Sequence, residues 1–434
     1  MIPIKYNQAI EYLESSISQG VKNNATDVLR ILNSFGDPQK NMNVVHITGT
    51  NGKGSTAAYV ASILEVSGQK VGLFTSPHLS DFRERIRING KKIGKKVIPV
   101  LLEKIKAAAE SLGLLPSYFE IMTIVAVLYF SSENCDVSVV EVGLGGRLDS
   151  TNILYGKVCV ITGIDFDHVE YLGNTLEDIA REKVAIVKPG SVLIVNVSND
   201  KLYDLIEKAA YAHGASDVIC VRKFVRGDII SSTTDGIIFD ALSPSLSALR
   251  LKTPLVGNYQ LENAKTAISV VEIMKRLSMT EAGSDCIKKG LLKTKWPGRF
   301  EIFGENGRIV IDGAHNASGM SNFVENLRRL FPFRRIRSIV GILKTKDYGS
   351  MLDTIAKVSD EIIITGLDNS KKPIDVQYLK DYVTKIHGNV KDFKQVSLAL
   401  EYAEKTCAAN DLICITGSLY LIGEVRPLII NRFK

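Results

Sequence analysis

Short apolar runs, separated by longer stretches with helical spacing, dominate the first two thirds of the chain. The runs are continuously apolar and rich in β-branched residues, a pattern typical of parallel strands covered on both faces by helices. The segment 217–252 contains shorter runs broken by turn residues, and it predicts a small antiparallel side sheet before a helix at about 259–276. The strands expected in the main sheet are 43–48, 70–74, 136–142, 157–162 and 191–197.

After WPGRFE (296–301) the alternation of strand and helix begins again, with strands expected in RIVIDG, RSIVGIL, DEIIITG and DLICITG. A chain of 434 residues is longer than one hydrophobic core usually supports. We therefore predict an α/β fold with two domains. Residues 1–295 should form a parallel sheet flanked by helices and the side sheet, and residues 296–434 a smaller Rossmann-like α/β domain.

Composition and charge exclude several classes of protein. Hydrophobic residues make up 45% of the chain and charged residues 23%, as in ordinary globular proteins. The longest apolar runs, such as 121–130, are too short to span a bilayer, so we expect a cytoplasmic protein without a membrane partner. The net charge of +7 is spread along the chain without interleaved aromatic residues, so we expect no nucleic-acid partner.

In an open parallel sheet, ligands bind beyond the carboxyl ends of the strands. The first predicted strand is followed by GTNGKGS (49–55), a loop typical of P-loop-type domains. Its glycines allow backbone N–H groups to face an anion, Lys53 can neutralise phosphate, and Ser55 or Thr56 can reach Mg²⁺. The usual spacing GxxxxGK[ST] is not met, because Gly54 separates the lysine from the serine.

Three further strand ends carry possible metal ligands. Ser76 follows the second predicted strand, Glu141 lies at the end of the third, and His168 follows the fourth. A salt bridge with Arg147 or a similar cation is an equal alternative for Glu141, and a hydrogen-bonding surface residue is the alternative for His168. If the three side chains meet at one edge, they predict a magnesium site, since Mg²⁺ prefers oxygen and occasionally accepts imidazole.

Two more groups of polar residues are candidates for ligand binding. Arg83, Arg85 and Arg87 alternate as one face of a strand would, and they can bind carboxylates or form a solvated face. Asp312 and His315 follow a predicted strand of the second domain, where turn and helix-cap chemistry is the alternative.

Taken together, these motifs resemble those of the folylpolyglutamate synthases and dihydrofolate synthases, members of the Mur ligase superfamily. The resemblance implies a ligase: ATP phosphorylates a carboxylate of dihydropteroate, of a folate or of both, and the amine of L-glutamate displaces the phosphate. Mg²⁺ is the implied cofactor, and ATP is a co-substrate. The similarity covers nearly the whole chain, through HITGTNGKGS, TSPHLSDFRERIRING, VEVGLGGRLDSTN, DFDHVEYLGNTLEDIAREK, VKPG, GNYQLENAKTA, WPGRFE, IDGAHN and TGSLYLIGEVR.

The resemblance also implies roles for individual residues. Lys53, Lys183 and His168 would be catalytic, and Lys183 matches a lysine that family members carbamylate; an unmodified lysine that binds phosphate is the alternative. The magnesium ligands would be Ser76, Glu141 and His168. The ATP-binding residues would be Gly49, Thr50, Asn51, Gly52, Lys53, Gly54, Ser55, Thr56, Asn263, Arg299, Asp312 and His315. The pteroyl substrate would be bound by Phe119, Glu120, Leu148, Asp149, Arg83 and the segment SQGVKNNATDVLRILNSFGDP.

Two other functions are alternatives at this point. A Mur-type ligase acting on a UDP-sugar peptide would need an N-terminal UDP-binding domain, for which no room precedes residue 48. A non-catalytic nucleotide switch would need no ATP contacts from a second domain. We expect a monomer whose domains close around ATP, whereas the linkage and length of the product do not follow from the sequence.

Overall fold

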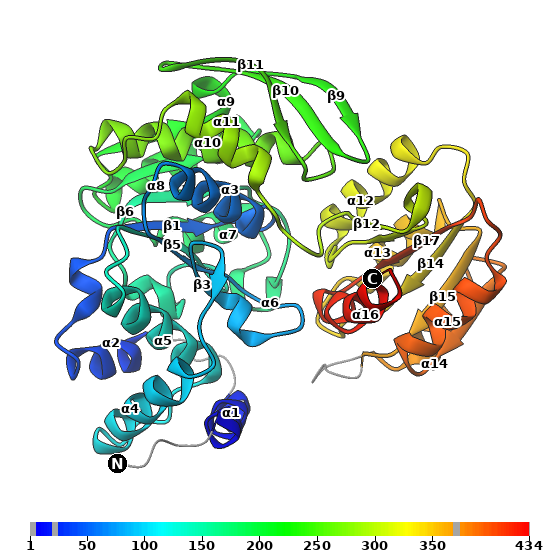
Figure 1. The fold of residues 1–434 in the computed structure, drawn as a ribbon, viewed down its shortest axis with the longest axis horizontal. Helices are drawn as coiled ribbons and strands as arrows, with labels where there is room; N and C mark the ends of the chain where they lie inside the picture. Colours follow the sequence, from blue (N-terminus) through cyan, green and yellow to red (C-terminus); the bar gives the residue numbers. More distant parts are fainter. Residues whose placement is uncertain (1–5, 20–24, 368–373, 434) are drawn as a thin grey trace.

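The computed structural model describes residues 6–19, 25–367 and 374–433, which form two α/β units built around separate sheets (Figure 1). The N-terminal unit lies on the left of Figure 1 and the C-terminal unit on the right, and residues 294–300 lead from the last helix of the first to the first strand of the second. Among the described residues, no helix has both the length and the apolar character needed to cross a bilayer.

The main sheet has eight strands in the order β4-β3-β2-β5-β1-β6-β7-β8. Neighbouring strands are parallel from β2 to β8, whereas β3 and β4 are antiparallel at one edge. All the main-sheet strands expected from the apolar runs are present. The bounds are β1 Val44–Thr48, β2 Val71–Phe74, β3 Ile86–Ile88, β4 Lys91–Lys92, β5 Val137–Glu141, β6 Gly156–Ile161, β7 Val192–Val195 and β8 Asp217–Cys220.

Helices cover both faces of this sheet, as the continuously apolar strands predict. Val45 and Ile47 of β1 pack with α3, α10 and α11, whereas Val44 packs with α2, α4 and α5 on the opposite face. Helices α7 and α8 cover the sheet at β6 and β7. The bounds are α1 Tyr6–Ser15, α2 Thr26–Asn33, α3 Lys53–Val66, α4 Val97–Ser111, α5 Tyr118–Ser132, α6 Val169–Leu172, α7 Leu176–Val184, α8 Asp200–Ala212, α9 Val221–Phe224, α10 Gln260–Arg276 and α11 Ser284–Lys293.

A three-stranded antiparallel sheet forms the predicted side sheet, at the top of Figure 1, from β9 (Ile229–Thr233), β10 (Gly236–Ser243) and β11 (Leu246–Thr253). The expectation that 217–224 belongs to this sheet is wrong. Residues of β8 join the main sheet beside β7, because Val218 and Cys220 bury their side chains in the cluster that includes α8.

The sheet of the C-terminal unit has the order β12-β13-β17-β14-β15-β16 and is parallel except for β12. The sequence does not predict β12 or β16, because EIF and VKDF are short and mix apolar with charged residues. Its strands are β12 Glu301–Phe303, β13 Ile309–Ile311, β14 Ile336–Val340, β15 Glu361–Thr365, β16 Val390–Phe393 and β17 Leu412–Thr416. Its helices are α12 Ala317–Leu330, α13 Tyr348–Ala356, α14 Val376–Thr384, α15 Val396–Thr406 and α16 Leu419–Arg432.

The predicted fold class is therefore confirmed: a parallel-rich sheet with a small antiparallel sheet beside it, and a second α/β unit. The division of the chain between residues 295 and 296 stays a prediction.

Candidate functional site

The loop between β1 and α3 brings backbone N–H groups to the start of a helix. Gly49 has a φ angle of 150° and Gly52 one of 87°, values that other residues rarely adopt. A Cβ would lie 2.1 Å from Thr162 Oγ1 at Gly49 and 2.4 Å from Asn263 Oδ1 at Gly52. Because Gly52 is the N-cap and has no side chain to accept the first N–H groups of α3, these groups form an anion site.

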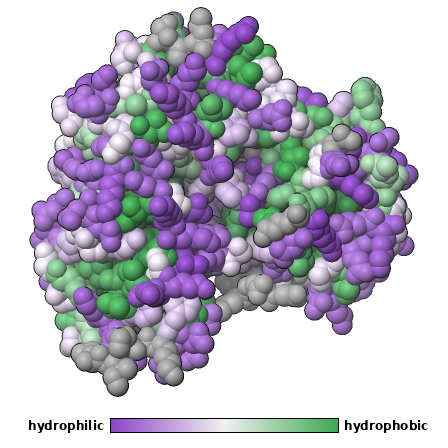
Figure 2. Space-filling model, in the orientation of Figure 1, coloured by the Kyte–Doolittle hydropathy of each residue, from purple (hydrophilic) through white to green (hydrophobic). Residues whose placement is uncertain are grey.

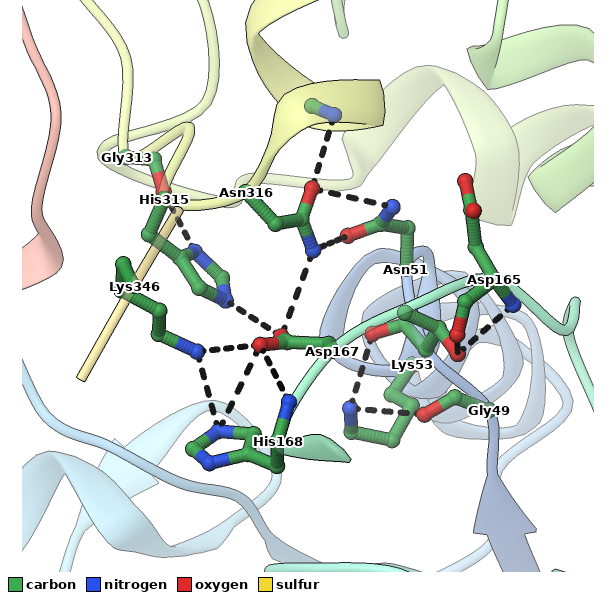
Figure 3. Close-up of polar contacts among 12 residues, drawn as sticks. Gly49, Asn51, Lys53, Asp165, Asp167, His168, Gly313, His315, Asn316 and Lys346 are labelled. Atoms are coloured by element: carbon green, nitrogen blue, oxygen red, sulfur yellow. Dashed lines mark hydrogen bonds and ion pairs between the residues drawn. The ribbon is translucent and has the colours of Figure 1, made fainter. Parts of the chain in front are cut away.

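Lys53, the first residue of α3, folds back over this loop (Figure 3). Its Nζ donates hydrogen bonds to the carbonyl oxygens of Gly49 at 2.9 Å and Thr50 at 3.1 Å. Burial lowers the pKa of the Lys53 ammonium, and Glu141 acts in the opposite direction. The cation therefore lies beside the N–H groups that would receive a phosphate.

The larger of two cavities at this loop has a volume of about 590 Å³ and lies between the two units. In the view of Figure 2, the surface between the units is hollowed and largely hydrophilic. Glu141, His168 and the glycine-rich loop share this cavity, as the strand-end argument predicts. Ser55 also lines it, whereas Thr56 is fully buried elsewhere. Other lining residues are Ser76, Asp167 and Lys183 from the N-terminal unit and Arg299, His315, Lys346 and Ser418 from the C-terminal unit.

Glu141, at the end of β5, is only 4% exposed. Its Oε2 accepts a hydrogen bond from the N–H of Ser76 at 3.1 Å. Burial raises the pKa of Glu141, and the neighbouring ammonium of Lys53 lowers it. The alternative of a salt bridge with Arg147 is wrong, because Arg147 pairs with Glu182 at 2.8 Å.

The cavity wall can hold part of a magnesium site. Among the described residues, no three His, Cys, Asp or Glu side chains gather closely enough to enclose a metal ion. Mg²⁺ needs no such cage, since one or two carboxylates, waters and substrate phosphates commonly hold it. Glu141 next to Ser76 fits this pattern. His168 fits less directly, because its Nε2 accepts a hydrogen bond from Lys346 Nζ at 3.0 Å.

Lys183 in α7 reaches the same loop. Its side chain is buried, with 3% of the residue exposed, and its Nζ donates to the carbonyl oxygen of Gly49 at 3.1 Å. Burial, assisted by the charge of Lys53, lowers the pKa of Lys183 to about 7. A large share of Lys183 is therefore a neutral amine near pH 7, where an ordinary lysine is protonated.

Asp167 is the centre of the polar contacts between the two units (Figure 3). Lys346 Nζ donates to Asp167 Oδ1 at 2.5 Å, and Asn316 Nδ2 donates to Asp167 Oδ2 at 3.3 Å and to Asn51 Oδ1 at 3.1 Å. Burial acts to raise the pKa of Asp167, but the ammonium of Lys346 holds it well below its usual range. No role was predicted for Lys346 or Asn316, although Asn316 lies in the IDGAHN motif and each residue follows a strand of the second sheet. The position after a strand end is the signal that could have identified both.

A second cavity, of about 270 Å³, shares the loop residues 50–52, Arg299 and His315 with the first. Asn263 and Asp312, two of the residues predicted to bind ATP, line it. The Asp312 carboxylate accepts the N–H groups of Phe300 at 2.8 Å and Ala314 at 2.7 Å. Asp312 therefore also fixes the loop after β13, and burial raises its pKa against the influence of Arg299.

The ring of His315 is neutral. Its Nδ1 lies 2.8 Å from the carbonyl oxygen of Gly313, and because a carbonyl only accepts, we assign the proton to Nδ1. Burial, followed by the charge of Lys346, lowers the pKa of His315. Its Nε2 contact with Asp167 at 3.7 Å is therefore not an ion pair.

The residues expected at the pteroyl substrate divide into two groups. Phe119, Leu148 and Asp149 line the larger cavity. Glu120 does not, because its carboxylate accepts the N–H of Ser117 at 2.6 Å and completes the capping box of α5. The N-terminal segment SQGVKNNATDVLRILNSFGDP was also predicted to bind this substrate, and its residues 20–24 lie outside the described residues.

The expectation that three arginines form one face of a strand is wrong. Arg83 and Arg85 belong to a 3₁₀ helix, Phe82–Arg85, because the Asp81 carboxylate caps this turn by accepting the N–H of Arg83 at 3.0 Å. Arg83 pairs with Asp81 at 2.6 Å and does not line either cavity. Only Arg87 lies in β3.

Arg85 lines the larger cavity in place of Arg83. It is 8% exposed, and its Nε donates to His78 Nδ1 at 2.9 Å. Its guanidinium lies 5.3 Å from the centre of the Tyr118 ring. A buried cation held by neutral groups is suited to bind an anionic part of a ligand.

Comparison with known proteins adds an independent observation. Residues 47–271 match the Mur ligase middle domain, and residues 298–419 match the Mur ligase glutamate ligase domain. The chain is 31% identical to the dihydrofolate synthase/folylpolyglutamate synthase of Bacillus subtilis, over 97% of this chain and 98% of that protein. The crystal structure of Thermotoga maritima folylpolyglutamate synthase is similar with a TM-score of 0.85 at 31% identity, over 98% and 97% of the two chains. Escherichia coli FolC in complex with DHPP and ADP is similar with a TM-score of 0.88 at 28% identity, over 99% and 98%.

Proposed function

The chain belongs to the dihydrofolate and folylpolyglutamate synthases, ATP-dependent ligases of the Mur family, and we propose from this that it joins L-glutamate to dihydropteroate, to folates or to both. One observation carries the proposal: the glycine-rich loop 49–55 of the N-terminal unit, which we call the phosphate loop, lines one cavity together with Arg299 and Lys346 of the C-terminal unit. A nucleotide and an acceptor carboxylate can therefore meet there. The ADP and DHPP of the FolC structure support the same two classes of ligand.

ATP would occupy both cavities. We place its phosphates at residues 49–55, where the N–H groups and Lys53 supply positive charge. The remainder would extend into the smaller cavity, past Asn263 and Asp312. Arg299 and His315 line both cavities and would contact the nucleotide from the C-terminal unit.

The proposed ligation has two steps, phosphoryl transfer and amide formation. An oxygen of the acceptor carboxylate attacks the γ-phosphorus, the bond to the β-phosphate oxygen breaks, and ADP leaves. The amine of glutamate then attacks the acyl carbon and loses a proton, and inorganic phosphate departs to leave an amide. Lys53 and the loop N–H groups stabilise the charge that spreads over the transferred phosphoryl group.

We assign Glu141 and Ser76, together with His168, as the protein ligands of Mg²⁺. The ion supplies charge neutralisation at the phosphate oxygens when it is bound. The buried carboxylate of Glu141 in the cavity wall is the observation that supports this assignment. His168 would have to exchange its hydrogen bond with Lys346 for the metal.

We propose that Lys183 reacts with CO₂, since it lines the larger cavity and its Nζ lies beside the glycine-rich loop. The nucleophile would be the neutral amine, which its lowered pKa of about 7 makes abundant. The nitrogen attacks the carbon of CO₂ and releases one proton, and the resulting carbamate is an anion beside the phosphate loop. An unmodified ammonium that contacts phosphate is the alternative for this residue.

The pteroyl part of the substrate would lie against Phe119, Leu148 and Asp149. Arg85, rather than Arg83, would meet its carboxylate. We further propose that the enzyme is a cytoplasmic monomer, since ATP is a cytoplasmic metabolite and one chain contributes both walls of the cavity. The domain boundary is proposed between residues 295 and 296.

The proposal is tested by ADP release from the purified chain. Release should require ATP, Mg²⁺, a pteroyl acid and L-glutamate together, and omission of either the pteroyl acid or the glutamate should abolish it. Parallel assays with dihydropteroate and tetrahydrofolate would show which acceptors are used. ATP hydrolysis that is indifferent to both the pteroyl acid and glutamate would contradict the proposed function.

A further inference from the structure

The loop after β2 inserts an apolar side chain into the C-terminal unit. Leu79 in this loop packs against the apolar cluster beneath α15 and α16. Two glycines make room for it. A Cβ at Gly298 would lie 3.2 Å from Leu79 Cδ1, and a Cβ at Gly423 would lie 2.1 Å from the Leu79 carbonyl oxygen. We call the recess formed by Gly298, Ile422 and Gly423 the Leu79 notch.

The inserted loop is held in shape by Glu84. The Glu84 carboxylate accepts the N–H of Leu79 at 3.0 Å and the hydroxyl of Ser80 at 3.2 Å. Across the junction, a hydrogen bond from Arg426 of α16 to Glu301 raises the pKa of Arg426, and Glu84 adds to this shift. Leu79 therefore enters the notch on a loop that Glu84 holds by hydrogen bonds, and the negative charge of Glu84 complements the positive charge of Arg426 in α16.

Both sides of the notch continue directly into the walls of the larger cavity. Ser76 precedes Leu79 in the loop, and Arg85 follows it at the end of the 3₁₀ helix; both line the cavity. Gly298 adjoins Arg299, and Gly423 lies in the turn of α16 that follows residues 418–420, which line the cavity at the start of this helix. Any shift of Leu79 in the notch would therefore move the two walls relative to each other.

We propose that Leu79 and Gly423 are positioning residues, whose contact sets the separation of the two halves of the active site. Neither residue lines either of the two cavities described above. The reaction joins groups held by two units, and a misplacement of about 1 Å can cost roughly a hundredfold in rate. The glycine is required because the Leu79 carbonyl oxygen occupies the space of a side chain.

The test compares Leu79→Ala, which empties the notch, with Gly423→Ala, which blocks it. Leu79→Met retains apolar volume and should rescue the loss. Leu400→Ala is the matched control, because Leu400 is fully buried in the same apolar cluster but belongs to α15. Each variant is assayed for kcat, for KM and for the thermal midpoint, and its radius of gyration is measured by small-angle scattering with and without an ATP analogue.

We expect Leu79→Ala and Gly423→Ala to lower kcat by about tenfold to a hundredfold, with smaller changes in KM, and to increase the radius of gyration. Leu79→Met should stay within about threefold of the wild type. Leu400→Ala should lower the thermal midpoint but keep kcat at temperatures where it is folded.

Normal kcat and unchanged scattering in both Leu79→Ala and Gly423→Ala would overturn the inference. It would also be overturned if Leu400→Ala lost as much kcat as these variants for the same fall in thermal midpoint. If Gly423→Ala does not fold, Leu79→Ala and its rescue decide the matter. Only the kcat measurement rests on the proposed function. A chain without ligase activity whose scattering still responds to Leu79→Ala would refute that function and retain this inference.

Discussion

Asp167→Asn should separate the two units, because it removes one charge from the ion pair that joins them. The side chains of Lys346 and Asp167 are 5% and 10% exposed, and Nζ lies 2.5 Å from Oδ1. Removal of one partner from a buried pair typically costs about 3–5 kcal/mol, since the other charge remains buried. At about 1.4 kcal/mol per factor of ten, the ratio of joined to separated molecules should fall by roughly a hundredfold to a few thousandfold.

Small-angle scattering measures this separation directly, and urea unfolding measures the loss of stability. Glu110→Gln is the matched control, because the Glu110 side chain is 67% exposed and pairs with Lys106 at 3.8 Å. Exposed pairs of this kind contribute about 0–1 kcal/mol. In a double-mutant cycle, Asp167→Asn should cost little once Lys346→Met is present. The reasoning is refuted if Asp167→Asn changes neither quantity more than Glu110→Gln does.

Three further predictions concern the phosphate loop and Lys183, which contacts it. Lys53→Met should lower kcat about a thousandfold, as loss of a cation at a transferring phosphoryl group does; a loss below about tenfold in steady-state kinetics would contradict this role. Gly49→Ala should abolish nucleotide binding in calorimetry, because its Cβ would collide with Thr162 Oγ1 at 2.1 Å, and wild-type affinity would disprove this. In the absence of CO₂, where the amine is unmodified, Lys183→Met should stabilise the fold by up to about 5 kcal/mol, since the folded pKa is about 7 rather than 10.5. Between pH 7 and pH 10.5 the unfolded wild-type chain binds more protons than the folded one, so the stability of the wild type rises with pH. The free energy of unfolding that Lys183→Met gains over the wild type should therefore be largest below pH 7 and shrink towards pH 10.5. A gain that grows with pH would contradict this prediction.

The sequence predicts those parts of the fold that depend on local pattern. Continuously apolar runs locate β1, β5 and β6, and the strand-end rule brings Glu141 and His168 to one cavity. The sequence around Glu120 carries a local signal for a structural role of this residue. Ser117 and Glu120 have the spacing of a capping box, which indicates a role in α5 rather than at the substrate.

Contacts between the units do not follow from local pattern. Asp167 and Lys346 are 179 residues apart in the chain, and their pairing depends on how the two sheets face each other. The contact of Leu79 with Gly423 cannot be predicted from local pattern either, because an apolar residue in a loop is common and only the structure shows the glycine beside it. Arg85, rather than the expected Arg83, lines the larger cavity, because the Asp81 cap turns the backbone into a 3₁₀ helix.

The central claim is that the cavity between the units transfers the γ-phosphoryl group of ATP to the carboxylate of a pteroyl acid before glutamate is joined. It is tested most directly with a pteroyl acid whose reacting carboxylate carries ¹⁸O. The account predicts that one labelled oxygen appears in the inorganic phosphate for each amide formed, and that no phosphate is labelled when ATP is omitted. Amide formation with unlabelled phosphate would contradict it.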